Sequence, residues 1–392
     1  MKALLELHVL QNFAPSNLNR DDTGSPKDAI FGGSRRARIS SQSLKRAMRM
    51  FVREHGLLET RHLAERSKRF GDEIAERLVN EGKDRELVKT VVALALGGVG
   101  LKLKDDGKTE YLVFLGQSEL DQIAQLVSAN WDQLEQAVKE QQPAAGAKAK
   151  DAKKAAKFAV PDDLRKQLEK TIRNRKDGGD AVDVALFGRM LADMPEKNQD
   201  AACQVAHAIS THKVDREFDF YTAVDDLKPE DNSGADMLGT VEFNSACYYR
   251  YAVIDLSLLQ HNLQGDSELV YKGLEAFLRA AILSAPSGKQ NTFAAHNPPS
   301  FVALTVRRDA SPRSLTNAFE KPARANPQHS LTEASLGQLQ GEWQKLEAFY
   351  GQGGETVLWN GTGLEVTLGD AAGNVAELVA VAVSKARAAL EA

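Results

Sequence analysis

Cysteine is scarce in this chain of 392 residues, which contains only Cys203 and Cys247 and no CxxC pair. A disulfide framework or a zinc ribbon needs more cysteines at closer spacing, so neither is supported. No apolar run is long enough to cross a bilayer. The N-terminal stretch MKALLELHVLQNF alternates like a strand and lacks a small-residue cleavage site, so we expect no signal peptide. We therefore expect a reduced, cytoplasmic protein with no membrane contact.

The usual motifs of cofactor and metal chemistry are also missing. No GxxxxGK[ST] phosphate loop is present, and GGVG at 97–100 does not match GxGxxG. His207 and His212 are five residues apart, which is off the i, i+4 spacing of a helical metal pair. No Ser-His-Asp or Cys-His arrangement stands out. We therefore expect no cofactor, no metal site and no catalytic site.

What the chain has is an ordinary globular composition, with 42% hydrophobic and 27% charged residues. Chains above about 250–300 residues usually divide into domains. Residues 3–10 alternate as a strand does, residues 11–39 read as a long loop, and a helix is predicted from Ser41. Later in the chain we predict an extended hairpin at 214–246, strands at 247–256 and 301–308, and helices at 268–284 and 374–391. Strands at both ends with helices inserted between them indicate an α+β fold.

One low-complexity segment interrupts this pattern. Residues 141–157, QQPAAGAKAKDAKKAAK, consist mostly of Ala, Lys and Gly and offer almost nothing to bury. Such a composition is typical of a flexible connection.

The most informative stretch is basic. Eight Lys and Arg residues and one acid, Asp28, lie between Lys27 and Arg53, although the whole chain has a net charge of −4. In the predicted helix, the residues Leu44, Ala47, Met48 and Phe51 form an apolar stripe. At 100° per residue, the side chains on the opposite face are Lys45, Arg46, Arg49 and Arg53.

Two interpretations of this stretch remain open on charge alone: a solvated cationic helix face, or a phosphate-binding surface. Gly32 and Gly33 favour the second, because glycine lets a backbone approach a ligand closely. Serines at a helix start favour it too, since free N–H groups and the helix dipole attract anions there. In that interpretation Arg38, Lys45 and Arg49 supply charge. Ser40 and Gln42 donate hydrogen bonds.

Two further pairs of residues are candidates. Phe220 and Tyr221 lie in the predicted hairpin, where they belong either to its packing or to an exposed wedge that stacks on unpaired bases. Lys289 and Gln290 lie in a loop after Pro286, where a solvated lysine is the simpler interpretation.

Several segments together resemble a known family. They are HVLQNFAPSNLNRDD, KDAIFGGSRRARISSQSLKRAMR, GRM at 188–190, AHAISTHKVD, FYTAVDDL and RYAVIDL, in that order. They resemble the CasC family, the repeated backbone subunit of the type I-E CRISPR surveillance complex called Cascade. The match runs from about residue 5 to residue 330.

The resemblance implies a subunit shaped like a right hand. It implies a ferredoxin-like or RRM-like palm in two parts, 1–57 and 181–392. Helical fingers would be inserted at 58–180, and a β-hairpin thumb would span about 214–246. Several copies would line up along one guide RNA, and each thumb would flip one base out. Target DNA would pair with the displayed segments, and the other Cascade subunits would be further partners.

The resemblance also implies a set of RNA-binding residues. They are Arg20, Lys27, Ser40, Gln42, Lys45, Arg49, Met190, Phe220, Tyr221, Lys289 and Gln290. Arg38 and Arg46 are added to them from the basic stretch itself. Met190 and Tyr221 would form the kinking wedge, with Phe220 beside it. The function implied is a non-catalytic RNA scaffold. The alternative is a metal-dependent endoribonuclease, because related backbone subunits cut RNA with an aspartate in the loop that here holds Asp21 and Asp22.

Overall fold

The computed structural model describes residues 3–104, 106–140, 160–172, 179–192, 194–223, 237–351 and 353–392. The low-complexity segment at 141–157 and the thumb turn at 228–236 lie outside them. The chain forms two compact units. The sheet unit comprises Met1–Leu57, Cys203–Ser257 and Tyr271–Ala392, and the helical unit comprises Leu58–Ala202 and Leu258–Val270. The three-part division predicted from the sequence stays a prediction.

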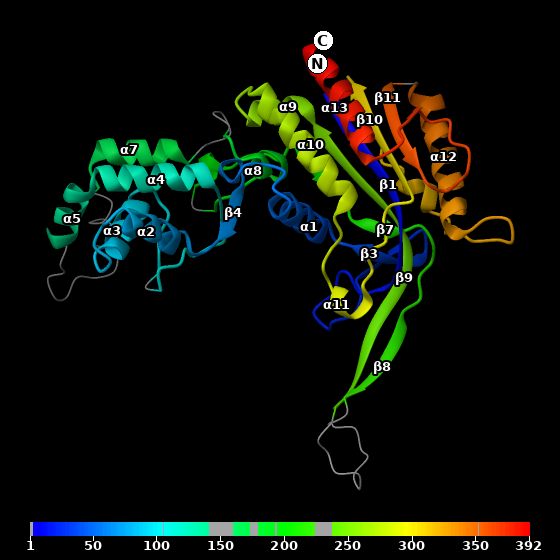
Figure 1. The fold of residues 1–392 in the computed structure, drawn as a ribbon, viewed down its shortest axis with the longest axis horizontal. Helices are drawn as coiled ribbons and strands as arrows, with labels where there is room; N and C mark the ends of the chain where they lie inside the picture. Colours follow the sequence, from blue (N-terminus) through cyan, green and yellow to red (C-terminus); the bar gives the residue numbers. More distant parts are fainter. Residues whose placement is uncertain are drawn as a thin grey trace, which may run out of the picture. The chain divides into compact units, whose positions relative to one another are not determined.

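The sheet unit is built on one large sheet (Figure 1). Within the described residues its order is β12-β11-β10-β1-β9-β7-β3-β2, and β6 and β8 pair with β9 off this path. All pairings are antiparallel except that between β11 and β12. The strands are β1 (Ala3–Ser16), β2 (Asp28–Phe31), β3 (Ser34–Ile39), β6 (Cys203–Val205), β7 (Ala208–Ser210), β8 (Glu217–Ala223), β9 (Met237–Asp255), β10 (Phe301–Arg308), β11 (Gly354–Asn360) and β12 (Asp370–Ala371).

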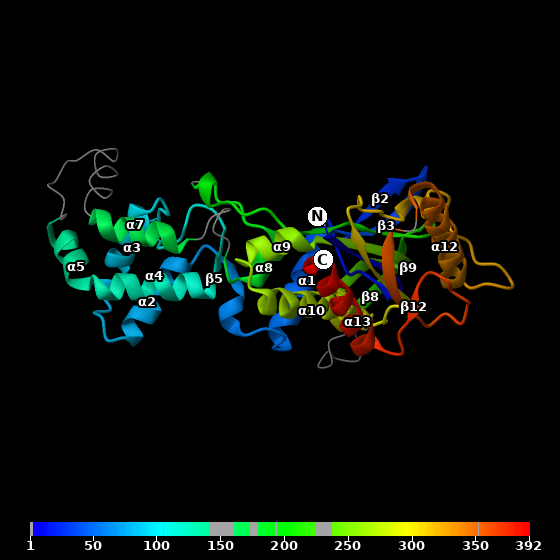
Figure 2. The same ribbon diagram turned by 90° about the horizontal axis from the view of Figure 1, so that it is seen from above.

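Helices cover both faces of this sheet. Leu4 and Leu10 of β1 share a buried cluster with Trp343 of α12. The alternate residues Leu5 and Leu7 face the other way, and α13 packs on β1, β10 and β11 (Figure 2). The helices with residues in this unit are α1 (Ser41–Glu54), α9 (Leu256–Asn262), α10 (Ser267–Leu283), α11 (Gln290–Phe293), α12 (Leu331–Tyr350) and α13 (Val375–Glu391), with the 3₁₀ helix Thr316–Phe319.

The strand β9 is long enough to serve two structures. Its later residues pair with β1 inside the sheet, and its first residues pair with β8 as a two-stranded ribbon that extends away from the sheet (Figure 1). Every residue of β8 is exposed. Within the segment at 214–246, the described residues thus include two paired antiparallel strands, β8 and the start of β9.

The helical unit has its own apolar core. The residues Ile74, Val91, Leu120 and Leu164 from four helices are all buried in it. Its elements are α2 (Phe70–Asn80), α3 (Val88–Gly98), α4 (Gln117–Ala129), α5 (Trp131–Glu140), α7 (Asp162–Thr171), α8 (Val182–Phe187), the strand pair β4 (Ala64–Ser67) and β5 (Val113–Gly116), and the 3₁₀ helices Thr60–His62 and Pro195–Lys197. No helix among the described residues of the chain is both long and apolar enough to cross a membrane.

Two local predictions differ from the structure. Residues 11–39 are not one loop, because β1 continues to Ser16 and β2 and β3 form a hairpin around Gly32 and Gly33. Both glycines have positive φ, which is the conformation that a tight hairpin turn requires. The apolar stripe of α1 is also shifted by one residue in its last turn. Val52 is buried instead of Phe51, which is only half-buried.

A polar network lies inside the sheet unit. Glu6 of β1 pairs with Arg307 of β10 and accepts a hydrogen bond of 2.7 Å from the Tyr251 hydroxyl. His8 Nδ1 lies 2.8 Å from the Tyr249 hydroxyl, and that hydroxyl accepts a hydrogen bond from the backbone N–H of Leu315. Complete burial lowers the pKa of His8 to about 4, so the imidazole stays neutral.

We predict that His8 makes the stability of the protein depend on pH. The folded pKa of about 4 lies below the ordinary value of 6.5, so the unfolded state binds more protons between these two values. The free energy of unfolding should therefore fall as pH is lowered through that window, by up to about 3 kcal/mol. Urea unfolding at a series of pH values measures this loss.

The control for this experiment is a second histidine variant. His8→Gln should reduce the slope between pH 6.5 and 4, because the buried imidazole at this position is gone, while His207 and His212, whose pKa values are also lowered, still contribute. His329→Gln removes an exposed histidine and should leave the slope unchanged. Below that window a loss of stability should remain in both variants, because Glu6 also titrates there. Burial alone would raise the pKa of Glu6, but its neighbours His8 and Arg307 and the N–H of Arg313 lower it.

Candidate nucleic-acid interface

The start of α1 is held by two side chains. Ser40 caps the helix, and its hydroxyl accepts a hydrogen bond from the N–H of Ser43. Asn19 accepts a hydrogen bond of 2.8 Å from the N–H of Ser40. The first turn carries no acidic residue, so the positive end of the helix dipole is not neutralised locally. Gln42 is exposed beside it.

Positive charge gathers where β3 precedes this helix. Arg38 Nη1 lies 2.9 Å from Nδ1 of His207, and Arg38 Nε donates to the carbonyl of Asp28. Arginine only donates, so His207 Nδ1 accepts. Partial burial, followed by the charges of Arg38 and Lys27, lowers the pKa of His207. The charges of Lys27 and Arg38 are thus both close enough to lower the pKa of the same imidazole, so these two side chains are neighbours on one surface.

The sequence overstates the free charge of the basic stretch. Arg36 is fully buried, and its guanidinium donates to the carbonyls of Phe31, Ser210, Thr211, Phe319 and Glu320. Arg35 forms an ion pair with Asp28. These two arginines hold the fold together and do not add unpaired charge to a binding surface.

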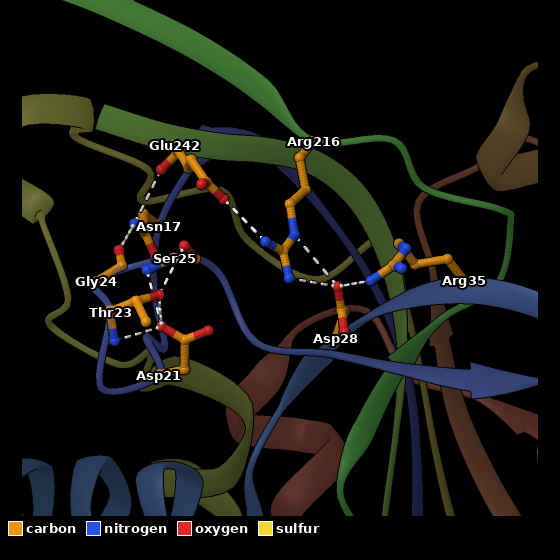
Figure 3. Close-up of polar contacts among 9 residues, drawn as sticks. All are labelled: Asn17, Asp21, Thr23, Gly24, Ser25, Asp28, Arg35, Arg216 and Glu242. Atoms are coloured by element: carbon orange, nitrogen blue, oxygen red, sulfur yellow. Dashed lines mark hydrogen bonds and ion pairs between the residues drawn. The ribbon is translucent and has the colours of Figure 1, made fainter. Parts of the chain in front are cut away.

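Asp28 is the centre of a clamp between the hairpin and the ribbon (Figure 3). Arg216 Nη2 lies 2.8 Å from the Asp28 carboxylate, and Arg216 Nη1 lies 3.1 Å from that of Glu242. Burial alone would raise the pKa of Asp28, but the bonds from Arg216 and Arg35 lower it. Because Arg216 directly precedes β8 and Glu242 lies on β9, the clamp fixes the base of the ribbon.

The loop at 17–27 is tied to the same place. Asn17 Nδ2 donates to the carbonyls of Gly24 and Glu242, at 3.0 and 2.9 Å (Figure 3). Asp21 Oδ1 accepts three hydrogen bonds, from Thr23 N–H, the Thr23 hydroxyl and Ser25 N–H. These bonds, the hydroxyl first, lower the pKa of Asp21. Its carboxylate is therefore engaged in shaping the loop, from which Arg20 is exposed.

The loop after α10, at 284–299, approaches the loop at 17–27, and we call these the second and the first loop. A side chain at Gly288 would place its Cβ 2.3 Å from the carbonyl oxygen of Leu18. The next residue, Lys289, has a left-handed backbone and is half-exposed. Gln290 has a structural task, because its Nε2 donates to the carbonyls of Ala295 and Pro286 inside the loop. The structure thus brings the region of Lys289 beside the Asn17–Lys27 loop, while the Gln290 amide N–H groups are already used.

The ribbon presents its aromatic residues on two faces. Phe220 and Tyr221 are neighbours in a strand, so they point to opposite sides, and they are 64% and 45% exposed. A Cβ on Gly239, which pairs with Tyr221, would lie 2.4 Å from the tyrosine ring. Tyr221 therefore covers the glycine of its partner strand and still offers part of its ring to solvent.

Met190 belongs to the helical unit and is 82% exposed. The residue before it, Arg189, forms a buried ion pair of 2.8 Å with Glu119, and its backbone pairs with that of Gln199. Met190 is thus an exposed apolar side chain on a braced loop.

Three other predicted residues lie on α1. Arg46 is exposed, while Lys45 and Arg49 are half-buried. No group of His, Cys, Asp and Glu residues in the described ranges is arranged to hold a metal ion.

The comparisons with known proteins agree over almost the whole chain. A family model described as CT1975-like protein matches residues 5–381. The chain belongs to this family. Two solved chains resemble it in fold, from complexes titled "CRISPR RNA-guided surveillance complex, pre-nicking" and "CRISPR RNA-guided surveillance complex".

The first of these chains is 30% identical, with a TM-score of 0.82 over 98% of this chain and 100% of that chain. The second is 25% identical, with a TM-score of 0.70 over 97% and 99%. No curated protein sequence matches significantly. The mixed α+β architecture of this member of the CT1975-like family is therefore that of CRISPR surveillance-complex subunits.

In this family member, sequence reasoning missed the residues that support the surface: Asn17, Asp28, His207 and Arg216. Their partners lie between 7 and 225 positions away in the chain, as in the bonds from Asn17. A local pattern does not reveal such partners. The segments that carry the resemblance contain Asn17, Asp28 and His207, but nothing in their local pattern marks these residues as supports of the surface.

We predict that Gly288→Ala separates the two loops. The added methyl would meet the backbone of Leu18, which has no flexible end to move aside. Overpacking of this kind costs about 1–3 kcal/mol. Thermal unfolding should show that loss, together with weaker binding of single-stranded RNA. Gly337→Ala is the control, since it lies in α12 with nothing within 4 Å of the new Cβ. It should stabilise the protein by about 0.5–1 kcal/mol, and a Gly288→Ala protein as stable as the unmodified one would refute the close approach.

Proposed function

We propose that this protein is the non-catalytic, guide-RNA-binding backbone subunit of a type I-E CRISPR surveillance complex of the Cascade kind. Several copies bind along the spacer of one guide RNA and present it for pairing with target DNA. The other subunits of the complex are its further partners. Two buried, unpaired cysteines, Cys203 and Cys247, are compatible with the reducing cytoplasm as its location.

The observation that carries this proposal is the full-length likeness to a chain of an RNA-guided complex, at 30% identity over 98% of the protein. A likeness that includes the ribbon, the two loops and the helical unit favours the same task for the whole chain. The basic residues near the start of α1 supply the chemistry, since they suit phosphate contacts that do not depend on sequence.

The order of the central strands supports a ferredoxin-like palm. The strands β10, β1, β9 and β7 are neighbours in that order, with α1 between β1 and β7 in the chain and α10 between β9 and β10. This is the β-α-β-β-α-β arrangement of that fold. In RRM domains bases stack on the open sheet face. Here α12 covers one face and α13 the other, so RNA would bind at the loops and the start of α1.

The ribbon corresponds to the proposed thumb, and the helical unit to the proposed fingers. Phe220 and Tyr221 on the ribbon and Met190 on the helical unit are large apolar side chains exposed to solvent. Exposed aromatic rings are the groups on which unpaired bases stack. We propose that they flank the base that each copy displaces.

A scaffold without catalysis is supported over a ribonuclease by the loop that holds Asp21. One oxygen of its carboxylate accepts three hydrogen bonds from Thr23 and Ser25. A carboxylate committed to capping its own loop is a poor metal ligand unless the loop rearranges. Incubation of the assembled complex with matched RNA and magnesium tests the point, and cleavage lost in Asp21→Asn or in Asp22→Asn would favour the ribonuclease.

We predict that binding to single-stranded RNA weakens steeply with salt. Each phosphate contact contributes a slope of about −0.7 in log affinity against log salt for single strands. The double variant Lys27→Ala, Arg38→Ala should therefore reduce the slope by about 1.4. Fluorescence anisotropy across a salt series measures both slopes.

The matched control removes two positive charges from α12 and α13 instead. Lys345→Ala with Arg387→Ala changes the net charge equally and should keep the slope of the unmodified protein. Equal loss in both double variants would mean that only the net charge matters. An affinity that does not change with salt would reject the phosphate-binding surface.

We predict a regular period of unpaired bases along the guide RNA, with one in each copy. Chemical probing of the assembled complex should show it, and Met190→Ala with Tyr221→Ala should blur it. Each lost stacking contact is worth about 1–3 kcal/mol. Tyr221→Leu separates stacking from packing, since leucine still covers Gly239 but offers no ring. If Tyr221→Leu keeps the full period, Tyr221 acts only in the packing of the ribbon.

A further inference from the structure

An exposed histidine stands among the cations near the start of α1. His207 directly precedes β7, and β7 pairs with β3 through Ile209 and Arg38. The Nδ1 atom of His207 accepts a hydrogen bond of 2.9 Å from Nη1 of Arg38. Because Nδ1 accepts, the neutral imidazole carries its proton on Nε2. His207 therefore lies within reach of any ligand that Arg38 binds.

Arg38 is held at several points and keeps donors for a ligand. Its Nε donates to the carbonyl of Asp28 at 3.1 Å, and its backbone N–H donates to the carbonyl of Lys27 at 2.9 Å. A guanidinium has five N–H groups. Contacts within the described residues use the one on Nε and one on Nη1, which bonds to His207. The others can donate to a phosphate oxygen at this half-buried side chain.

The electrostatic surroundings of His207 are positive. The charged groups on the elements packed around it are Arg38 of β3, Lys27 of the first loop, Lys45 of α1, Arg250 of β9 and Asp28 of β2. The carboxylate of Asp28 is already engaged by the two arginines of the clamp. Partial burial, and then the charges of Arg38 and Lys27, lower the pKa of His207 from its ordinary value of 6.5. The imidazole is therefore neutral at pH 7 in the protein without RNA.

We propose that His207 is a further RNA-binding residue, which releases Arg38 and takes up a proton when a phosphate of the guide RNA binds beside it. This proposal rests on the proposed function, because that function makes a phosphate the ligand. A phosphate is charged, so the hydrogen bond that Arg38 donates to it is about twice as strong as a bond between neutral groups. When Nη1 of Arg38 turns to the phosphate, the lone pair on Nδ1 of His207 accepts a proton from water. The imidazolium then donates to the same phosphate.

The direction of the pH dependence follows from the charge of the phosphate. A phosphate offsets the charges of Lys27 and Arg38, so the pKa of His207 should rise on binding. Between the lower pKa of the free protein and the higher pKa of the complex, the complex holds more protons. By linkage, the affinity for RNA should therefore increase as the pH falls through this window, by up to about tenfold per pH unit. A histidine that only anchors Arg38 would stay neutral and give no such increase.

The first test measures the affinity of the full chain for a short oligouridine at constant salt, between about pH 8 and pH 6. Neither uracil nor the phosphodiester takes up a proton in this range, so the protein supplies the pH dependence. His207→Gln retains an acceptor for Arg38 but cannot become positive, so it should lose most of the increase. The matched control is His329→Gln, which removes an exposed histidine before α12 and should keep the increase.

Calorimetry counts the protons directly. Titrations with the same oligouridine in two buffers of different ionisation enthalpy give the number of protons taken up by each bound copy. The unmodified protein should take up more than His207→Gln does, by at most about one proton. Arg38→Ala removes a positive neighbour, so it should raise the pKa of His207 in the free protein and move the increase in affinity to higher pH.

The outcomes separate the two proposals. If the unmodified protein binds no oligouridine at any of these pH values, the proposed function is wrong. If it binds but takes up no proton, or if His207→Gln keeps the full pH dependence, the role of His207 is wrong and the proposed function stands. Circular dichroism checks that the variants are folded. Should His207→Gln not fold, proton uptake by the unmodified protein in the two buffers decides the question without it.

Discussion

The carboxylate of Asp28 is the constraint on which the candidate interface depends. It binds Arg35 within the β2–β3 hairpin and Arg216 at the base of the ribbon. Arg216 continues the connection to Glu242 on β9, and the backbone of Glu242 in turn holds Asn17 of the first loop. One acidic residue thus positions hairpin, ribbon and loop together. Without it two arginines would face each other at the point where the ribbon leaves the sheet.

The distribution of charge explains how a protein with a net charge of −4 still presents a positive surface. Much of the basic stretch is internal support, since Arg36 serves five carbonyl groups and Arg35 serves Asp28. The surface that remains combines few charges, such as Lys27 and Arg38, with a helix start that carries no acid. Such a surface attracts phosphate groups without reading bases.

The features that the sequence predicts well are those with local causes. The helix beginning at Ser41 follows from its cap and apolar spacing, and its start is confirmed. The sequence prediction misses the hairpin around Gly32 and Gly33, because it assigns these glycines to a close approach of a ligand, although Gly-Gly is also a turn signal. The burial of Arg36 was beyond local reasoning, since its acceptors lie at 31, 210, 211, 319 and 320. The same holds for the engaged amide of Gln290.

The continuity of β9 limits how the ribbon can vary in length. Side chains alternate between the two sides of a strand. One extra residue of β9 between Asn244 and the ribbon would therefore turn Thr240 and Gly239, the partners of Phe220 and Tyr221, to the opposite sides. Insertions of one residue near the sheet should therefore be rejected during evolution, while insertions of two residues preserve the alternation. Length variation is tolerated best at the end of the ribbon, where both strands lengthen together. The ribbon can thus be tuned in reach without disturbing the sheet that carries it.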